Sequence, residues 1–248
     1  MRLYVIRHGQ KASPEPNRGR DRNPPLTDRG ERQVNHLAEF LADEELDAVY
    51  SSSQLRALQT AERVHDRVDA DWHVWPLFCE TDQRRWEDRH ADCRSDDSGP
   101  AAWPTGDSVP ADSAHVDDPD ARYTLSELPD EFPGVRLSQP FPWPDAWWVP
   151  TRGQTHAMGY ARVELGLQAL LDRHGDGGGV AIVCHGNAGD KALTSLLDMP
   201  RRRQSRRFSF SNTGVSRLDR RGAERWGIVY VNRTDHLPPE LRDSERVF

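Results

Sequence analysis

The chain has 248 residues, of which 35% are hydrophobic, and its formal net charge is -7 at pH 7. This length and composition suffice for one sizeable core, or for one core with a small cap. The acidic balance argues against a general nucleic-acid or membrane-surface binder, because such proteins are usually basic. We therefore expect a globular protein that binds neither nucleic acid nor a membrane.

The cysteines and the N-terminus bear on the compartment. The chain has three cysteines and no CxxC spacing, which argues against a disulfide framework or a zinc site and fits a reducing compartment. No basic and then apolar signal region opens the chain, and no apolar run approaches the roughly 20 residues of a membrane span. These features predict a cytoplasmic protein.

The first predicted element is a strand formed by the apolar run LYVIRHG at residues 3–9. The run is short, rich in β-branched residues and ends at a glycine, which is typical of a buried parallel strand. A polar loop follows over residues 10–25. The segment LTDRG at residues 26–30 then predicts the start of a helix, with Thr27 as its N-cap.

A second strand is predicted over residues 46–50, followed by Ser51, Ser52 and Ser53. The next helix carries an apolar face of Leu55, Leu58, Ala61 and Val64. A third short strand is predicted over residues 73–77. From residue 88 to residue 150 the composition changes to one rich in Pro, Asp, Ser and Trp, without a sustained helical or strand period. We interpret residues 88–150 as an irregular inserted cap, because long insertions in compact domains are usually functional lids or disordered.

Regular structure is predicted to resume with a long helix over residues 155–174. The run VAIVCHG at residues 180–186 is a second buried strand, followed by a helix that ends near residue 199 and by strands over residues 214–218 and 226–231. The alternation of strands and helices predicts one α/β domain, a three-layer sandwich with a mostly parallel central sheet flanked by helices.

Two of the predicted strands end in His-Gly, at His8 and His185. Ligands of open α/β sheets bind beyond the carboxyl ends of the strands, so both imidazoles should meet in one crevice together with Arg7. A neutral His8 could attack phosphorus, and Arg7, Arg56 and a protonated His185 could hold the phosphoryl oxygens. The sequence thus indicates a phosphate site with a histidine nucleophile. A metal site built on the two histidines is the less favoured interpretation, since no third ligand has a metal-like spacing.

Five motifs in order resemble the histidine phosphatase superfamily, also called the phosphoglycerate-mutase-like family. They are RHG at residues 7–9, LTDRG at 26–30, SSSQLRALQTA at 51–61, CHG at 184–186 and NTGV at 212–215. The resemblance covers the first 87 residues and the last 95 or so, and leaves the insert unexplained. It implies that His8 is the nucleophile, that Arg7, Arg56, His185 and Gly186 bind the phosphoryl group, and that no cofactor or metal is needed.

The family's proton donor is a Glu after the third strand, which the resemblance places at Glu80, with Asp82 as the second candidate. Arg84 and Asp88 replace two glycines of the family's pattern there. Gln10 and Asn187, each next to a motif glycine, are possible pocket residues. The loop after RHG lacks the Trp of the glycolytic mutases, which favours hydrolysis over mutase chemistry.

These features predict a metal-independent phosphomonoesterase for a small phosphorylated metabolite, with a homodimer as one possible assembly. Two alternatives stay open: a phosphoryl-transfer isomerase, and a non-catalytic or repurposed phospholigand-binding protein on the same fold. The basic segment at residues 201–207 is interpreted as a solvated loop rather than as a polyanion-binding patch. Cys184 is interpreted as a buried apolar filler and not as a nucleophile.

Overall fold

The computed structural model describes residues 1–12, 23–81, 126–137, 156–175, 177–201, 206–222 and 225–243. Within these ranges a single sheet of seven strands has the order β4-β3-β2-β5-β1-β6-β7. Strands β4, β3, β2, β5 and β1 run parallel to one another, whereas β6 and β7 are antiparallel to their neighbours. The strands are β1 (Arg2–Arg7), β2 (Ala48–Ser51), β3 (Asp71–Val74), β4 (Val135–Arg136), β5 (Gly179–Cys184), β6 (Val215–Arg221) and β7 (Arg225–Arg233).

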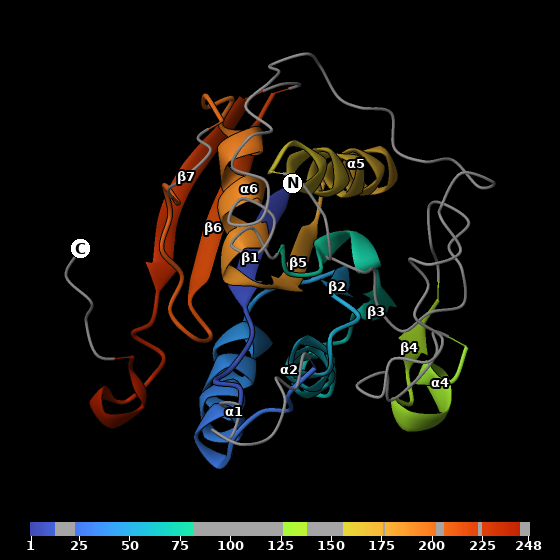
Figure 1. The fold of residues 1–248 in the computed structure, drawn as a ribbon, viewed down its shortest axis with the longest axis vertical. Helices are drawn as coiled ribbons and strands as arrows, with labels where there is room; N and C mark the ends of the chain where they lie inside the picture. Colours follow the sequence, from blue (N-terminus) through green and yellow to red (C-terminus); the bar gives the residue numbers. More distant parts are fainter. Residues whose placement is uncertain are drawn as a thin grey trace, which may run out of the picture.

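Helices cover both faces of this sheet (Figure 1). Helices α1 (Asp28–Ala42) and α2 (Leu55–His65) lie on one face, and α5 (His156–His174) and α6 (Gly186–Leu196) lie on the other. Three short helical segments complete the described elements: α4 (Leu128–Glu131), η1 (Pro76–Phe78) and η4 (Pro239–Leu241). The predicted three-layer α/β fold with a mostly parallel sheet is therefore confirmed. In the described residues, no helix has the length and apolar character that crossing a membrane requires.

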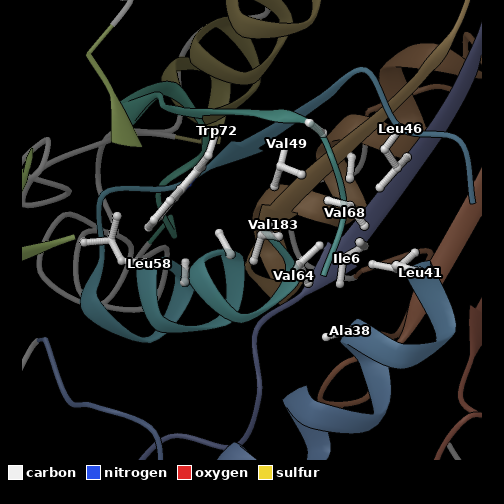
Figure 2. Packing of buried hydrophobic residues seen from close by; sticks show 14 of the residues in the cluster. Ile6, Ala38, Leu41, Leu46, Val49, Leu58, Val64, Val68, Trp72 and Val183 are labelled. Atoms are coloured by element: carbon white, nitrogen blue, oxygen red, sulfur yellow. The ribbon is translucent and has the colours of Figure 1, made fainter. Parts of the chain in front are cut away.

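The side chains of β1 explain why both faces need a cover. Tyr4 and Ile6 point into the core beneath α1 and α2, whereas Leu3 and Val5 point into the core beneath α5 and α6. Successive residues of a strand face opposite sides, so an uninterrupted apolar run produces a strand buried on both faces. Figure 2 shows the first of these cores, in which Ile6, Val183 and Trp72 of the sheet belong to one cluster with the apolar faces of α1 and α2.

The start of α1 follows the sequence prediction. Thr27 is the N-cap, and its hydroxyl accepts a hydrogen bond of 3.0 Å from the amide of Gly30. A Cβ at Gly30 would lie 2.1 Å from the carbonyl oxygen of Gln10, so only glycine fits where this loop crosses the helix. The same Gln10 carbonyl accepts from the amide of Thr27 at 2.9 Å. The LTDRG motif therefore fixes the loop that follows His8.

Most predicted elements lie within a few residues of their predicted bounds, and two regions depart further from the prediction. The third strand lies at Asp71–Val74 rather than at residues 73–77, because Pro76 cannot donate to a sheet ladder and instead begins the 3-10 turn η1. Within the predicted irregular insert, α4 and β4 are regular, and β4 pairs parallel with β3 as the edge of the sheet. Leu128, Phe132 and Val135 bury against the α1/α2 core. The remainder of the predicted cap lies outside the described residues.

Candidate active site

The register of three adjacent strands brings the candidate residues together. Arg7 pairs with Cys184 across β1 and β5, and Ser51 pairs with Val183 across β2 and β5. The residues that follow these positions are therefore neighbours at the carboxyl end of the sheet. The rings of His8 and His185 have centroids 5.0 Å apart, and the Ser52 hydroxyl lies 2.8 Å from Nε2 of His185.

His8 is held as a neutral imidazole with an unprotonated Nε2. Its Nδ1 lies 2.6 Å from the carbonyl oxygen of Gly9, which can only accept, so Nδ1 carries the proton. Nε2 then accepts a hydrogen bond of 3.1 Å from Nε of Arg56. Burial lowers the pKa of His8 well below its usual range, and the charges of Arg56 and Arg7 lower it further. This arrangement offers a nitrogen lone pair beside a guanidinium.

Two arginines, the half-buried Arg7 and the buried Arg56, provide the positive charge at the site. Arg56, the second residue of α2, is 5% exposed and also donates to the side-chain oxygen of Gln54 at 3.2 Å. Arg7 donates from Nη1 to the carbonyl of Phe210, and its buried Nε has no hydrogen-bond partner within the described part of the chain. Burial lowers the pKa of Arg7, while the charge of Glu80 opposes that change. Two guanidinium groups around one nucleophile match the geometry of a phosphoryl group.

His185 is the N-cap of α6 and is fully buried. Nε2 pairs with Ser52, and Nδ1 is buried with no hydrogen-bond partner in the described ranges. Burial lowers the pKa of His185 well below its usual range, and the charge of Arg56 adds to this effect. The protonated His185 expected from the sequence is thus disfavoured by the protein's own groups. It would form only with the help of a neighbouring negative charge, such as a phosphoryl group.

Glu80 lies close to this cluster. One of its carboxylate oxygens accepts from the amides of Thr81 at 3.0 Å and Asn187 at 3.2 Å, the latter in the first turn of α6. The amide of Glu80 donates to the same Gln54 oxygen that binds Arg56. The Glu80 carboxyl therefore lies at the N-terminus of α6, next to Gly186 and Asn187. The other candidate donor, Asp82, lies outside the described residues.

The remaining predicted residues separate into two groups. Asn187 belongs to the site, because its amide binds Glu80 and its side-chain nitrogen donates to the carbonyl of Thr81 at 3.0 Å. Gly186, the first residue of α6, also lies at the site, directly after His185. Gln10 instead accepts from the hydroxyl of Thr27 at 2.9 Å, so its side chain belongs to the loop over the start of α1.

Several residues at or behind the site were missed by the sequence analysis. Ser52 and Gln54 lie in the SSSQLRALQTA motif, but the motif alone does not show that Ser52 contacts His185 or that Gln54 contacts Arg56. The buried cations Arg162 and Lys191 lie on apolar helix faces, where a charged residue is itself a signal of a specific partner. Arg206 belongs to the segment that the sequence predicts as a solvated loop; it is exposed, and its guanidinium also lies beside Gly186 and Asn187.

Two further features limit the chemistry. Cys184 is buried in β5, and burial raises the pKa of its thiol, so it stays protonated and is a poor nucleophile. Across the described ranges, His, Cys, Asp and Glu side chains form no group of three or more that could hold a metal ion. The cluster is therefore suited to anion binding and to attack by an imidazole nitrogen.

The chain was compared with known families, proteins and structures. The family model of the histidine phosphatase superfamily (branch 1) matches residues 3–123 and 119–234. No curated protein sequence matches significantly. One similar structure is YhfR of Bacillus stearothermophilus, with 22% identity, a TM-score of 0.61, and coverage of 95% of this chain and 98% of that one.

Two further structures with a similar fold are phosphatases. A phosphoserine phosphatase from Entamoeba histolytica, in complex with phosphoserine, has 18% identity, a TM-score of 0.57, and coverage of 96% of this chain and 99% of that one. A mycobacterial glucosyl-3-phosphoglycerate phosphatase has 20% identity, a TM-score of 0.58, and coverage of 93% and 98%. At these identities the similarity is one of fold.

Proposed function

Because the chain belongs to the histidine phosphatase superfamily (branch 1), as its motifs predicted, we propose that it hydrolyses a small phosphomonoester through a phosphohistidine at His8. The observation that carries this proposal is the state of His8. Its Nδ1–H is directed to the Gly9 carbonyl, and its Nε2 lone pair faces the Arg56 guanidinium. An imidazole fixed in this tautomer needs no deprotonation before it attacks phosphorus.

The first step transfers the phosphoryl group to the enzyme. Nε2 of His8 forms a bond to phosphorus as the bond from phosphorus to the ester oxygen breaks. The protonated carboxyl of Glu80 gives its proton to the leaving alkoxide. Arg7, Arg56 and His185 bind the non-bridging oxygens, where the negative charge of the transition state is spread.

The second step returns the enzyme to its starting state. The Glu80 carboxylate takes a proton from water, and the water oxygen attacks phosphorus. The bond between phosphorus and Nε2 breaks, which releases inorganic phosphate and leaves His8 neutral and Glu80 protonated. The reaction thus needs no metal ion or cofactor, because arginine and histidine side chains supply the positive charge.

The test is phosphate release from a panel of phosphomonoesters in the presence of a chelator, for wild type and His8→Ala. We expect release by wild type and no release above background by His8→Ala. His36→Ala, a histidine on α1 outside the site, is the matched control and should keep full activity. Residual activity of His8→Ala within a few-fold of wild type would refute the assignment of His8 as the nucleophile. Isomeric phosphoesters in place of free phosphate would indicate a mutase instead.

A further inference from the structure

We propose that Arg206 binds a second anionic group of the substrate, so that the enzyme selects phosphomonoesters that carry a carboxylate or a second phosphate. This inference rests on the proposed function and specifies its substrate class. Arg206 lies outside the five motifs, between CHG at 184–186 and NTGV at 212–215, and the first evidence is its position. A Cβ built on Gly186 would lie 2.9 Å from Nη1 of Arg206 and 3.4 Å from its Cζ. The guanidinium therefore covers the residue next to His185.

Arg206 is anchored in this position by side chains of α6. Its Nε donates to the side-chain oxygen of Asn187 at 2.6 Å. The amides of Arg207 and Phe208 donate to one oxygen of Asp190 at 2.8 and 2.9 Å, and Asp190 is itself 5% exposed. The backbone after Arg206 and the base of its guanidinium are thus both fixed to the helix that begins at the phosphoryl site.

The outer part of the guanidinium is available to a ligand. Arg206 is exposed, and no hydrogen bond joins its Nη1 or Nη2 to another residue of the described ranges. Its Nη groups form one edge of a planar fork, which pairs well with a carboxylate or phosphate. Asn187 occupies only Nε, so an anion could still bind Nη1 and Nη2.

Electrostatics favour an anion at this point. The charge of Arg206 contributes to lowering the pKa of both Arg7 and Lys191, so its field reaches the phosphoryl site. The carboxylate of Glu80 and that of Asp243 partly offset the charge on Arg7. Arg7 and Arg56 already suffice for a dianionic phosphoryl group. The charge of Arg206 acts against that of Arg7, and a second negative charge on the substrate would relieve this repulsion.

The test compares matched substrates that differ in one anionic group. Phosphoserine and phosphoethanolamine differ by a carboxylate, and a sugar bisphosphate and its monophosphate differ by a phosphate. In Arg206→Gln, the ratio of kcat/KM within the preferred pair should fall about tenfold or more, mainly through KM, as expected for one lost charge-assisted pair. The substrate pair whose ratio falls in Arg206→Gln identifies the second anionic group as a carboxylate or a phosphate.

Arg201→Gln is the matched control, because it removes the same charge from the same basic segment. Arg201 instead pairs with both oxygens of Glu164 at 2.7 and 2.6 Å and lies over the ring of Tyr160. Its variant should leave the ratio within about twofold of wild type. Equal ratios in wild type and Arg206→Gln for both pairs, or equal losses in the two variants, would overturn the inference.

Binding measured in the His8→Ala background separates this inference from the proposed function. The dissociation constants of the same four compounds are measured for His8→Ala with and without Arg206→Gln. If wild type hydrolyses nothing but binding still discriminates through Arg206, the inference holds and the hydrolase proposal fails. If wild type hydrolyses the esters but neither binding nor kinetics responds to Arg206→Gln, the inference fails and the hydrolase proposal stands. If wild type hydrolyses none of the esters and binding does not respond to Arg206→Gln, both the inference and the hydrolase proposal fail.

Discussion

Replacing Arg162 with Met should destabilise the fold and weaken catalysis together. Arg162 on α5 is fully buried, and its guanidinium donates to the carbonyls of Pro76 at 3.1 Å, Leu77 at 2.5 Å and Cys79 at 2.8 Å. These carbonyls belong to the turn between β3 and Glu80. Because the turn passes directly into Glu80, Arg162 holds the backbone that positions this carboxylate.

The size of the effect follows from these contacts. A hydrogen bond that involves a charged group contributes about 1.5–3 kcal/mol, so three contribute roughly 4.5–9 kcal/mol before desolvation. Removing the guanidinium relieves a desolvation cost of several kcal/mol but leaves buried carbonyls unpaired, so the net loss should be about 3–5 kcal/mol. For a chain of this length each kcal/mol lowers Tm by about 2–4 °C, which predicts a decrease of roughly 6–20 °C.

The assay combines thermal unfolding with steady-state kinetics on the best substrate. Arg162→Met should lower kcat by roughly tenfold to a hundredfold at a temperature where it is still folded, because a displaced Glu80 protonates the leaving group poorly. Gln168→Met lies on the exposed face of the same helix and should change Tm by less than about 2 °C. The reasoning is refuted if Arg162→Met unfolds within about 2 °C of wild type, or if its kcat is unchanged.

Three further predictions concern the site itself. Ser52→Ala removes the hydroxyl that orients His185 and should lower kcat/KM roughly tenfold without loss of fold, which steady-state kinetics and circular dichroism can check. The acidic limb of the pH profile of kcat/KM should lie well below pH 6.5, because catalysis needs a neutral His8. Burial lowers the pKa of His8, and the charges of Arg56 and Arg7 lower it further. An acidic limb at or above pH 6.5 would contradict this prediction. Cys184→Ala should keep kcat within a few-fold of wild type, and a loss of turnover in a folded variant would show that the thiol takes part.

The elements that the sequence predicts well are those with strong local patterns. The runs at β1 and β5 are apolar throughout, and such runs require burial on both faces, which in turn requires helices on both sides. Thr27 was predicted as an N-cap for a local chemical reason, and it forms that cap. Once the two strands are adjacent, the proximity of His8 and His185 follows from their position directly after the strands.

The elements that escaped prediction depend on long-range contacts. The strand β4 has two residues, too few for any period, and it is a strand only because β3 offers an open edge. The partners of Arg162 lie more than 80 positions earlier in the chain, in a turn whose carbonyls do not pair with a neighbouring strand. Arg206 lies in a basic segment that looks solvated by composition, and it reaches the site because Asp190 anchors the backbone beside it.

The central claim is that His8 carries the phosphoryl group during turnover. The most direct measurement mixes enzyme with a phosphomonoester substrate, stops the reaction at alkaline pH during turnover, and locates the phosphoryl group by peptide mass spectrometry. Glu80→Gln should be included with an aryl phosphate whose leaving group needs no proton, because the first step then stays fast and slower attack by water increases the trapped fraction. The account predicts an acid-labile phosphoryl group on the peptide that contains His8, absent from His8→Ala. Turnover with no phosphoryl group on His8, or with the group on His185, would contradict it.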